Sequence, residues 1–222
     1  YGLIGDCETA ALVGRDGSID WLCWPAFDSD ACFAALLGTH WNGRWLISPA
    51  EEVTKSSRRY VDNTLILETR FETANGTVAL TDFMPPRGNA SDVVRLVRGV
   101  RGKVKLQMQL IIRFGFGTDI PWVKRTEEGA LLAICGHDMT VLRTPVETRG
   151  ENLTTVANFE VSEGETIPFV LTYGPSHLPL PGPIDPAQAL QDTEHFWSEW
   201  CSHCTYQGDY RDLVLRSLIT LK

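Results

Sequence analysis

The sequence has few long apolar runs, fewer basic than acidic residues, and no sign of a leader segment. Its longest apolar runs are short, such as Ala130–Cys135, whereas a membrane-spanning helix needs roughly 20 apolar residues. No basic segment followed by an apolar one opens the chain, so we expect neither a signal peptide nor a membrane partner. Lys and Arg number 20 against 28 Asp and Glu, and the net charge of −8 disfavours nucleic acid as a partner.

Common catalytic motifs are also absent. The segment Gly14–Gly17 lacks the spacing and the following helix of a phosphate-binding loop, and there is no Gly-x-Ser-x-Gly nucleophile motif. The five histidines do not cluster along the sequence. We therefore expect no cofactor.

The six cysteines do not have the spacing of a disulfide framework, and a chain of 222 residues does not need disulfides to fold. We expect free thiols in a cytoplasmic protein. The segment Cys201–Cys204, with the sequence Cys-Ser-His-Cys, resembles a metal motif and has His195 nearby. It lacks a second ligand pair at zinc spacing, so we predict no metal site.

From Tyr1 to about Gly174 the pattern is one of short strands and turns. Apolar residues alternate with others along Leu106–Phe114 and again along Ile167–Tyr173, which indicates strands with one buried face. Turn signals recur between such runs: Arg15-Asp16-Gly17, Asn75-Gly76, Arg101-Gly102, Glu128-Gly129, Gly136-His137-Asp138, Arg149-Gly150 and Glu163-Gly164. Many short antiparallel strands at this spacing predict a β-sandwich over residues 1–176.

The pattern changes at His177–Pro186, where four prolines within ten residues indicate a linker. Asp185 and Pro186 are typical of the N-cap and first position of a helix, and apolar residues then recur at three- and four-residue steps. We assign residues 177–208 to the linker and its helix. Residues 209–222 form a second helix that is apolar nearly all round and stops without a cap, so we expect the start of a further domain.

The stretch Pro86–Arg125 holds nine Lys or Arg against Asp92 and Asp119. On alternating strands such residues most often form a solvated face, which is our expectation. An anion-binding or partner-binding surface is the alternative.

Aromatic residues are concentrated near the N-terminus. Trp21, Trp24 and Phe27 lie close to Asp20 and Asp28, and sugar sites combine flat aromatic rings with carboxylates. Strand alternation sends Trp21 and Trp24 to opposite faces unless a bulge intervenes, and we expect Trp21 in the core.

Pro25 interrupts the strand that begins at Ile19, because proline cannot donate to a ladder. The loop that follows makes Trp24, Phe27 and Asp28 our substrate-binding candidates. In the alternative, Trp24 and Phe27 pack into the sandwich and Asp28 caps a helical turn at Phe33–Leu37.

Several motifs together resemble the opening of bacterial glycoside hydrolase family 15 proteins, the glucoamylase- and trehalase-like enzymes. They are Ile4-Gly5-Asp6, Thr9–Val13, Asp16–Cys23, Trp24–Ser29, Arg59-Tyr60, Asn63-Thr64-Leu65, Thr81–Pro85 and Arg216–Lys222. Ala26 departs from the family, which commonly has arginine there.

The resemblance implies an antiparallel β-supersandwich joined by linker helices to an (α/α)6 barrel that carries both catalytic glutamates. Inverting hydrolysis needs an acid and a base carboxylate roughly 6.5–9.5 Å apart. By this resemblance neither glutamate lies in residues 1–222, and Glu194 and Glu199 fall on different faces of their helix. We therefore predict no catalytic residue here, and an inactive fragment.

The resemblance leaves three roles open. We favour the non-catalytic N-terminal domain of an enzyme of glucoamylase, glucodextranase or trehalase type that acts on α-linked glucosides (maltooligosaccharides or trehalose). The alternatives are a free-standing carbohydrate-binding module and a purely structural domain. In the first role its partners are its own barrel and the oligosaccharide or disaccharide substrate.

Overall fold

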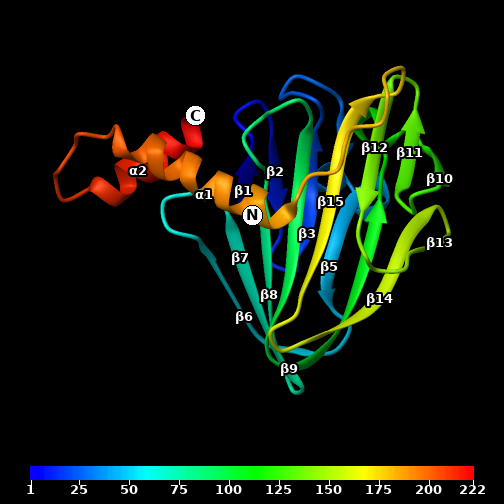
Figure 1. The fold of residues 1–222 in the computed structure, drawn as a ribbon, viewed down its shortest axis with the longest axis horizontal. Coiled ribbons are helices and arrows are strands. Elements are labelled where there is room, and N and C mark those ends of the chain that lie inside the picture. The colour runs from blue at the N-terminus through cyan, green and yellow to red at the C-terminus, as the bar shows by residue number, and fades with distance from the viewer.

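A computed structural model describes all residues, 1–222. Fifteen strands form one continuous hydrogen-bonded array that divides into two antiparallel sheets (Figure 1). The first sheet contains the strands β1 (Gly2–Gly5), β2 (Ala10–Val13), β3 (Ser18–Cys23), β4 (Ala31–Phe33), β5 (Arg44–Pro49), β13 (Arg149–Glu151) and β14 (Thr154–Ser162). The second contains β6 (Val53–Tyr60), β7 (Leu67–Thr73), β8 (Gly76–Phe83), β10 (Trp122–Arg125), β11 (Leu131–Cys135), β12 (Asp138–Arg143) and β15 (Thr166–Pro175). The predicted antiparallel β-sandwich is confirmed.

One long strand, β9 (Ser91–Ile111), belongs to both sheets. Its first half pairs with β8 and β15 of the second sheet, and its second half pairs with β5 and β14 of the first. Gly102, with φ of +66°, lies where the strand passes between them. Arg101-Gly102 was predicted to be a turn between strands, and this prediction is wrong. A left-handed glycine can bend a strand without ending it.

The other turn signals have different outcomes. The hairpins around Asp16-Gly17, Asn75-Gly76, Glu128-Gly129 and Gly136-His137 are confirmed. Arg149-Gly150 instead lies within β13, and the chain reverses two residues later at Asn152 and Leu153, which have φ of 48° and 59°. A short 3₁₀ helix at Ala35–Leu37 occupies the predicted helical turn.

The main core lies between the sheets and matches the period-two patterns. Leu106, Met108, Leu110, Ile112 and Phe114 are all buried, as are Ile167, Phe169, Leu171 and Tyr173. Both sets belong to one cluster of 31 buried apolar residues drawn from the two sheets. The alternation in the sequence therefore identified the inward faces of β9 and β15 correctly.

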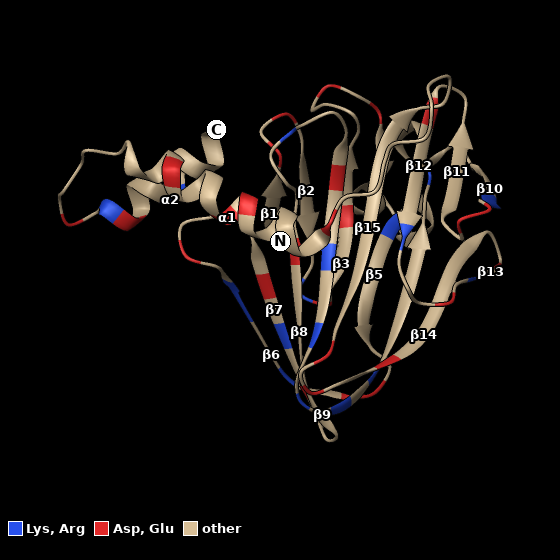
Figure 2. Ribbon diagram, viewed as in Figure 1, with Lys and Arg blue, Asp and Glu red and all other residues tan.

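The basic stretch 86–125 divides into two groups. Arg98, Arg101 and Lys105 are exposed, in agreement with the predicted solvated face, and blue segments of the ribbon mark the Lys and Arg positions in Figure 2. Arg95 and Arg113 contradict it, because 0% and 5% of their surfaces are exposed. A period-two pattern does not distinguish an outward arginine from one that is buried with hydrogen-bond partners.

Helix α1 (Pro186–Ser202) begins as predicted: the Asp185 side chain accepts hydrogen bonds from the backbone N–H of Ala187 and Gln188, and Pro186 follows it. The helix packs on the sandwich through Trp197, which is buried with Leu65. No helix in the structure combines the length and the apolar character that crossing a membrane requires.

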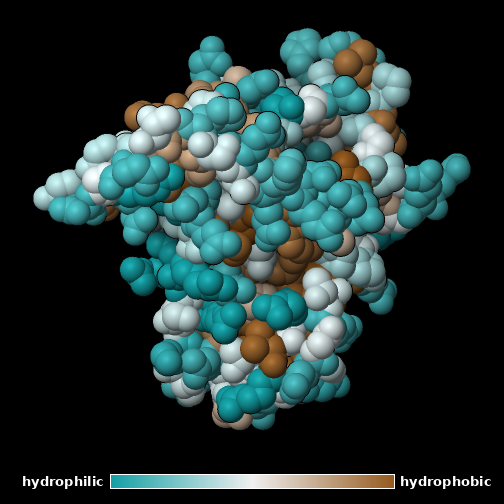
Figure 3. Space-filling model, turned by 60° about the vertical axis from the view of Figure 1, so that its left-hand side comes forward, coloured by the Kyte–Doolittle hydropathy of each residue, from teal (hydrophilic) through white to brown (hydrophobic).

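Helix α2 (Arg211–Leu221) packs beside α1. Its buried residues are Leu215 and Ile219, whereas Leu213 and Leu221 are 69% and 81% exposed. A helix that is apolar nearly all round suits full burial, but in this structure only one face of α2 has a partner. The face of the molecule seen in Figure 3 is mostly hydrophilic, with hydrophobic atoms gathered near its middle.

Candidate functional site

The loop after β3 contains the three predicted substrate-binding residues, and the structure separates them. Trp24 is only 3% exposed; its indole Nε1 donates to the Ser91 hydroxyl at 2.8 Å, and its ring lies 5.8 Å from that of Tyr173. Phe27 is 67% exposed, and Asp28 is exposed as well. Phe27 and Asp28 are therefore available to a ligand or partner, while Trp24 anchors the loop from inside.

The expectation that Trp21 lies in the core is wrong. Trp21 is half-buried outside the main core, beside Cys23, and Trp24 belongs to the main core with Leu22. The cause is a register shift against β2, where Leu12 pairs with Trp21 but Val13 pairs with Ile19. The extra residue at this bulge shifts the inward-facing positions of β3 from odd to even numbers: Ile19 faces the core before it, and Leu22 and Trp24 face the core after it.

A buried carboxylate, Asp6, holds the loop in place. Its Oδ2 accepts hydrogen bonds from Arg87 Nε at 2.8 Å and from the Ser91 hydroxyl at 2.7 Å. Its Oδ1 accepts from the backbone N–H groups of Glu8 and Thr9 at 3.0 and 2.9 Å. Every lone-pair direction of the carboxylate is thus used, which is what a buried charge requires.

Arg87 connects this carboxylate to the loop. Its Nη2 donates to the carbonyl of Pro25 at 2.6 Å, and the backbone N–H of Phe27 donates to the carbonyl of Glu8 at 3.2 Å. The residues 24–29 are therefore tied to the β1–β2 turn and to the segment after β8. We did not single out Asp6, Arg87 and Ser91 as site residues from the sequence; the Ile4-Gly5-Asp6 motif was the one available signal.

A cleft of about 1110 Å³ opens beside this network. It is lined by the segment 85–92, the end of β15, the prolines of residues 175–183, and α1. Asp92 and Tyr173 lie on its wall: Asp92 Oδ1 accepts from the Thr172 hydroxyl at 2.6 Å, and the Tyr173 hydroxyl donates to Asp138 Oδ1 at 2.8 Å. Burial raises the pKa of both Asp92 and Tyr173. Such a wall offers hydrogen-bond donors and acceptors to a polar ligand.

The remaining candidates from the sequence lie elsewhere. Glu194 and Glu199 are exposed on α1, as expected for solvated charges. All six cysteines are free thiols, and Cys201 and Cys204 lie at the end of α1. No three His, Cys, Asp or Glu side chains form a set that could hold a metal ion.

The comparisons with known proteins agree with one another. The sequence model of the family "Trehalase-like, N-terminal" matches residues 1–197. A trehalase of Thermoplasma volcanium is 28% identical over 230 residues, covering 100% of this chain and 36% of that protein. A trehalase of Thermoplasma acidophilum is 31% identical over 222 residues, covering 95% of this chain and 37% of that protein.

The fold has a solved counterpart. A crystal structure of a bacterial glucoamylase complexed with acarbose superimposes with a TM-score of 0.50 at 9% identity, covering 99% of this chain and 36% of that one. The chain spans a little over a third of the length of the curated relatives that it matches. On the match over residues 1–197, the chain belongs to the trehalase-like N-terminal domain family, and its fold is the one found in bacterial glucoamylase.

Proposed function

We propose that this chain is the non-catalytic N-terminal domain of an inverting glycoside hydrolase that acts on α-linked glucosides. The family match over residues 1–197 carries this proposal, together with relatives called trehalase that are far longer than the chain. In this proposal residues 1–176 are the sandwich, residues 177–208 the linker and its helix, and residues 209–222 the start of the first helix of the barrel. A cytoplasmic location, supported by the six free thiols, is part of it.

The surface of α2 supports a barrel as the partner of this domain. Leu213 and Leu221 are large, apolar and mostly exposed on a helix whose other face is buried. Apolar residues gathered on one helix face indicate a surface that packs against protein. A barrel helix pairing with α2 would cover them.

The position of α2 supports a role for the loop 24–29 at the barrel. Ile219 of α2 belongs to a cluster against which Cys7 packs. Burial raises the pKa of the Cys7 thiol, and the nearby charge of Lys222 acts in the opposite direction. The end of α2 thus lies beside the β1–β2 turn, to which the backbone of Phe27 is bonded. We infer that Phe27 and Asp28 border the mouth of the barrel, with Trp24 as the buried anchor of their loop.

The absence of catalysis in this fragment can be tested directly. The 222-residue chain and the full-length protein are incubated with trehalose, maltose and maltotetraose, and released glucose is measured. We expect glucose only from the full-length protein. Turnover by the fragment that scales with its concentration and survives repurification contradicts the proposal.

The role of the loop needs the full-length protein. Asp28→Ala is expected to lower kcat/KM while Tm stays unchanged, because the side chain is exposed. Glu128→Ala, an exposed carboxylate on the β10–β11 turn, is the matched control and should change neither quantity. A loss of Tm with normal activity per folded molecule would instead assign Asp28 to the structural role.

A further inference from the structure

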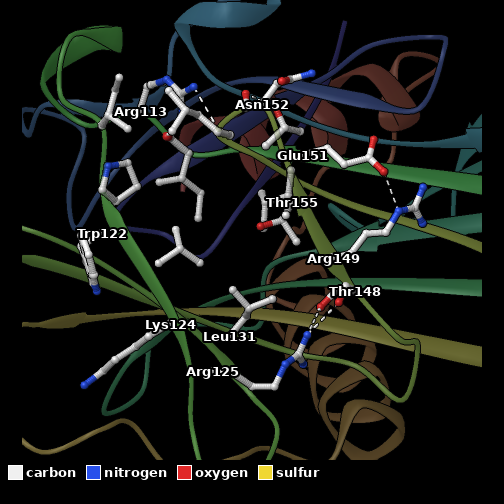
Figure 4. A pocket seen from close by; sticks show the side chains of 18 residues that line it. Arg113, Trp122, Lys124, Arg125, Leu131, Thr148, Arg149, Glu151, Asn152 and Thr155 are labelled. Atoms are coloured by element: carbon white, nitrogen blue, oxygen red, sulfur yellow. Dashed lines mark hydrogen bonds and ion pairs between the residues drawn. The ribbon is translucent and has the colours of Figure 1, made fainter.

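A separate pocket lies at the side of the sandwich opposite α1 and α2. There β10 and β11 of the second sheet face β13 and β14 of the first, and a cavity of about 520 Å³ remains between them (Figure 4). Small-molecule sites typically occupy roughly 300–1,000 Å³ and combine apolar walls with a few polar groups. The size of this cavity is that of a site for one small molecule.

The pocket combines an apolar interior with cationic walls. Leu110 and Ile112 of the β9 end and Leu131 of β11 supply apolar surface. The charged residues that line it are Arg113, Lys124, Arg125, Arg149 and Glu151, so that cations outnumber the single carboxylate. That carboxylate is already occupied, since Glu151 Oε1 pairs with Arg149 Nε at 2.6 Å.

Arg113 is a buried cation without an acidic partner. Only 5% of its surface is exposed, and it forms no ion pair. Its Nη1 donates to the carbonyl of Ile112 at 2.7 Å and its Nη2 to the carbonyl of Leu153 at 3.2 Å. Burial lowers the pKa of Arg113, the direction expected for a charge that nothing compensates.

Arg125, which is exposed, lies at the other end of the pocket and also donates to neutral oxygens. Its Nη2 donates to the carbonyl and hydroxyl oxygens of Thr148 at 2.8 and 2.9 Å. The two arginines thus fasten the two ends of the segment 148–153, which forms one wall of the cavity (Figure 4). Neutral carbonyl oxygens are weaker partners for a guanidinium than a carboxylate is, because they carry no charge to compensate it, whereas a carboxylate can also form two parallel hydrogen bonds with it.

The Leu153 carbonyl that accepts from Arg113 lies in the turn between β13 and β14. Leu153 has φ of 59°, a left-handed conformation that a bulky side chain rarely adopts, and its side chain is 68% exposed.

We propose that this pocket binds a small amphiphilic carboxylate, with its apolar chain on Leu110, Ile112 and Leu131 and its carboxylate paired with Arg113. The apolar interior of the pocket favours a ligand with an apolar tail. The uncompensated buried guanidinium favours a single acidic group on that ligand. This inference does not depend on the proposed function, because the pocket lies away from the loop 24–29 and from α2.

The test uses octanoate and 1-octanol as probes with the 222-residue chain. Binding is followed by backbone amide chemical shifts, which locate the site, and by calorimetry. We expect octanoate to shift the amides of residues 110–113, 122–125 and 148–155, and to bind at least about tenfold more tightly than octanol. Equal affinity for the two probes overturns the proposal, as do octanoate shifts confined to α2.

Variants then identify the cation. Arg113→Gln is expected to weaken octanoate binding about tenfold or more, while Arg101→Gln, an exposed arginine outside the pocket, should stay within about twofold of the original chain. Unchanged octanoate affinity in a folded Arg113→Gln variant overturns the proposal. If that variant fails to fold, the comparison of octanoate with octanol on the unsubstituted chain tests the proposal, because it needs no substitution.

Discussion

Arg95 and Asp82 form an ion pair with no exposed surface, in which Arg95 Nε lies 2.7 Å from Asp82 Oδ1. The same guanidinium donates to the carbonyls of Trp45 and Gly17, each at 2.6 Å. Arg95 is on the part of β9 in the second sheet, and both carbonyls belong to the first-sheet side of the sandwich. A single charged side chain therefore joins the two sheets through the core.

Asp82→Asn is expected to destabilise the domain by about 3–5 kcal/mol, because it leaves the buried guanidinium without a counter-charge. The measurement is urea unfolding of the 222-residue chain. The matched control is Glu72→Gln, which removes the exposed partner of Lys55 and should cost less than about 1 kcal/mol. Similar losses for the two variants would mean that the Arg95 charge finds compensation elsewhere.

Ser91→Ala is expected to destabilise the domain by about 1–3 kcal/mol. The hydroxyl of Ser91 accepts from the Trp24 indole and donates to Asp6, so its loss leaves the buried indole N–H without a partner and removes one of the two hydrogen bonds to Asp6 Oδ2. Ser198→Ala, an exposed serine on α1, should change the stability by no more than about 0.5 kcal/mol. Equal stability of both variants would show that the bond between Trp24 and Ser91 contributes nothing.

Tyr173 should make the domain sensitive to alkali. Its pKa is raised in the folded chain, first by burial and then by the hydrogen bond to Asp138, whereas an unfolded tyrosine titrates near about pH 10. Above that pH the folded chain holds a proton that the unfolded chain has lost, so the free energy of unfolding falls as pH rises. Tyr173→Phe should flatten this fall. The measurement is denaturant unfolding of both chains at several pH values from about 9 upward. If the free energy of unfolding falls equally steeply with pH in the original chain and in Tyr173→Phe, the prediction is contradicted.

Trp197→Ala is expected to cost about 3–5 kcal/mol, because the ring fills a fully buried position between α1 and the sandwich. Leu213→Ala on the exposed face of α2 should cost no more than about 0.5 kcal/mol. Thermal and urea unfolding of both variants measure the difference. If Trp197→Ala proves neutral, α1 adds nothing to the stability of the sandwich and can be removed with the linker.

The six cysteines should all react with a thiol reagent in denaturant without reductant. In the folded chain we expect Cys23 and Cys32 to react last, since both are buried and burial raises the pKa of each thiol. A count of two or fewer in denaturant would contradict both the free thiols and the cytoplasmic location.

The hairpins and the inward faces of β9 and β15 could be predicted because their signals are local. A turn such as Asn75-Gly76 and an alternation such as that of Ile167–Tyr173 depend on neighbours in the sequence. The helix start at Asp185-Pro186 is of the same kind. Each of these patterns has one physical interpretation that tertiary contacts seldom override.

The site was less predictable because its contacts span the chain. Asp6 accepts hydrogen bonds from Arg87 and Ser91, which are 81 and 85 positions away in the sequence. No local sequence pattern predicts contacts at such separations. The bulge that turned Trp24 inward and Trp21 outward depends on the register between β2 and β3. For the same reason the continuity of β9 through Gly102 could not be distinguished from a turn.

The shared strand β9 also sets the order in which the chain can mature during synthesis. Its partners β5 and β8 precede it, but β14 and β15 follow it and end only at Pro175. A nascent chain on the ribosome therefore presents an open edge of β9 in both sheets until residues 154–175 have emerged. Open edges of this kind invite intermolecular pairing, so the interval between the emergence of β9 and of β15 is the period in which the nascent chain most needs a chaperone.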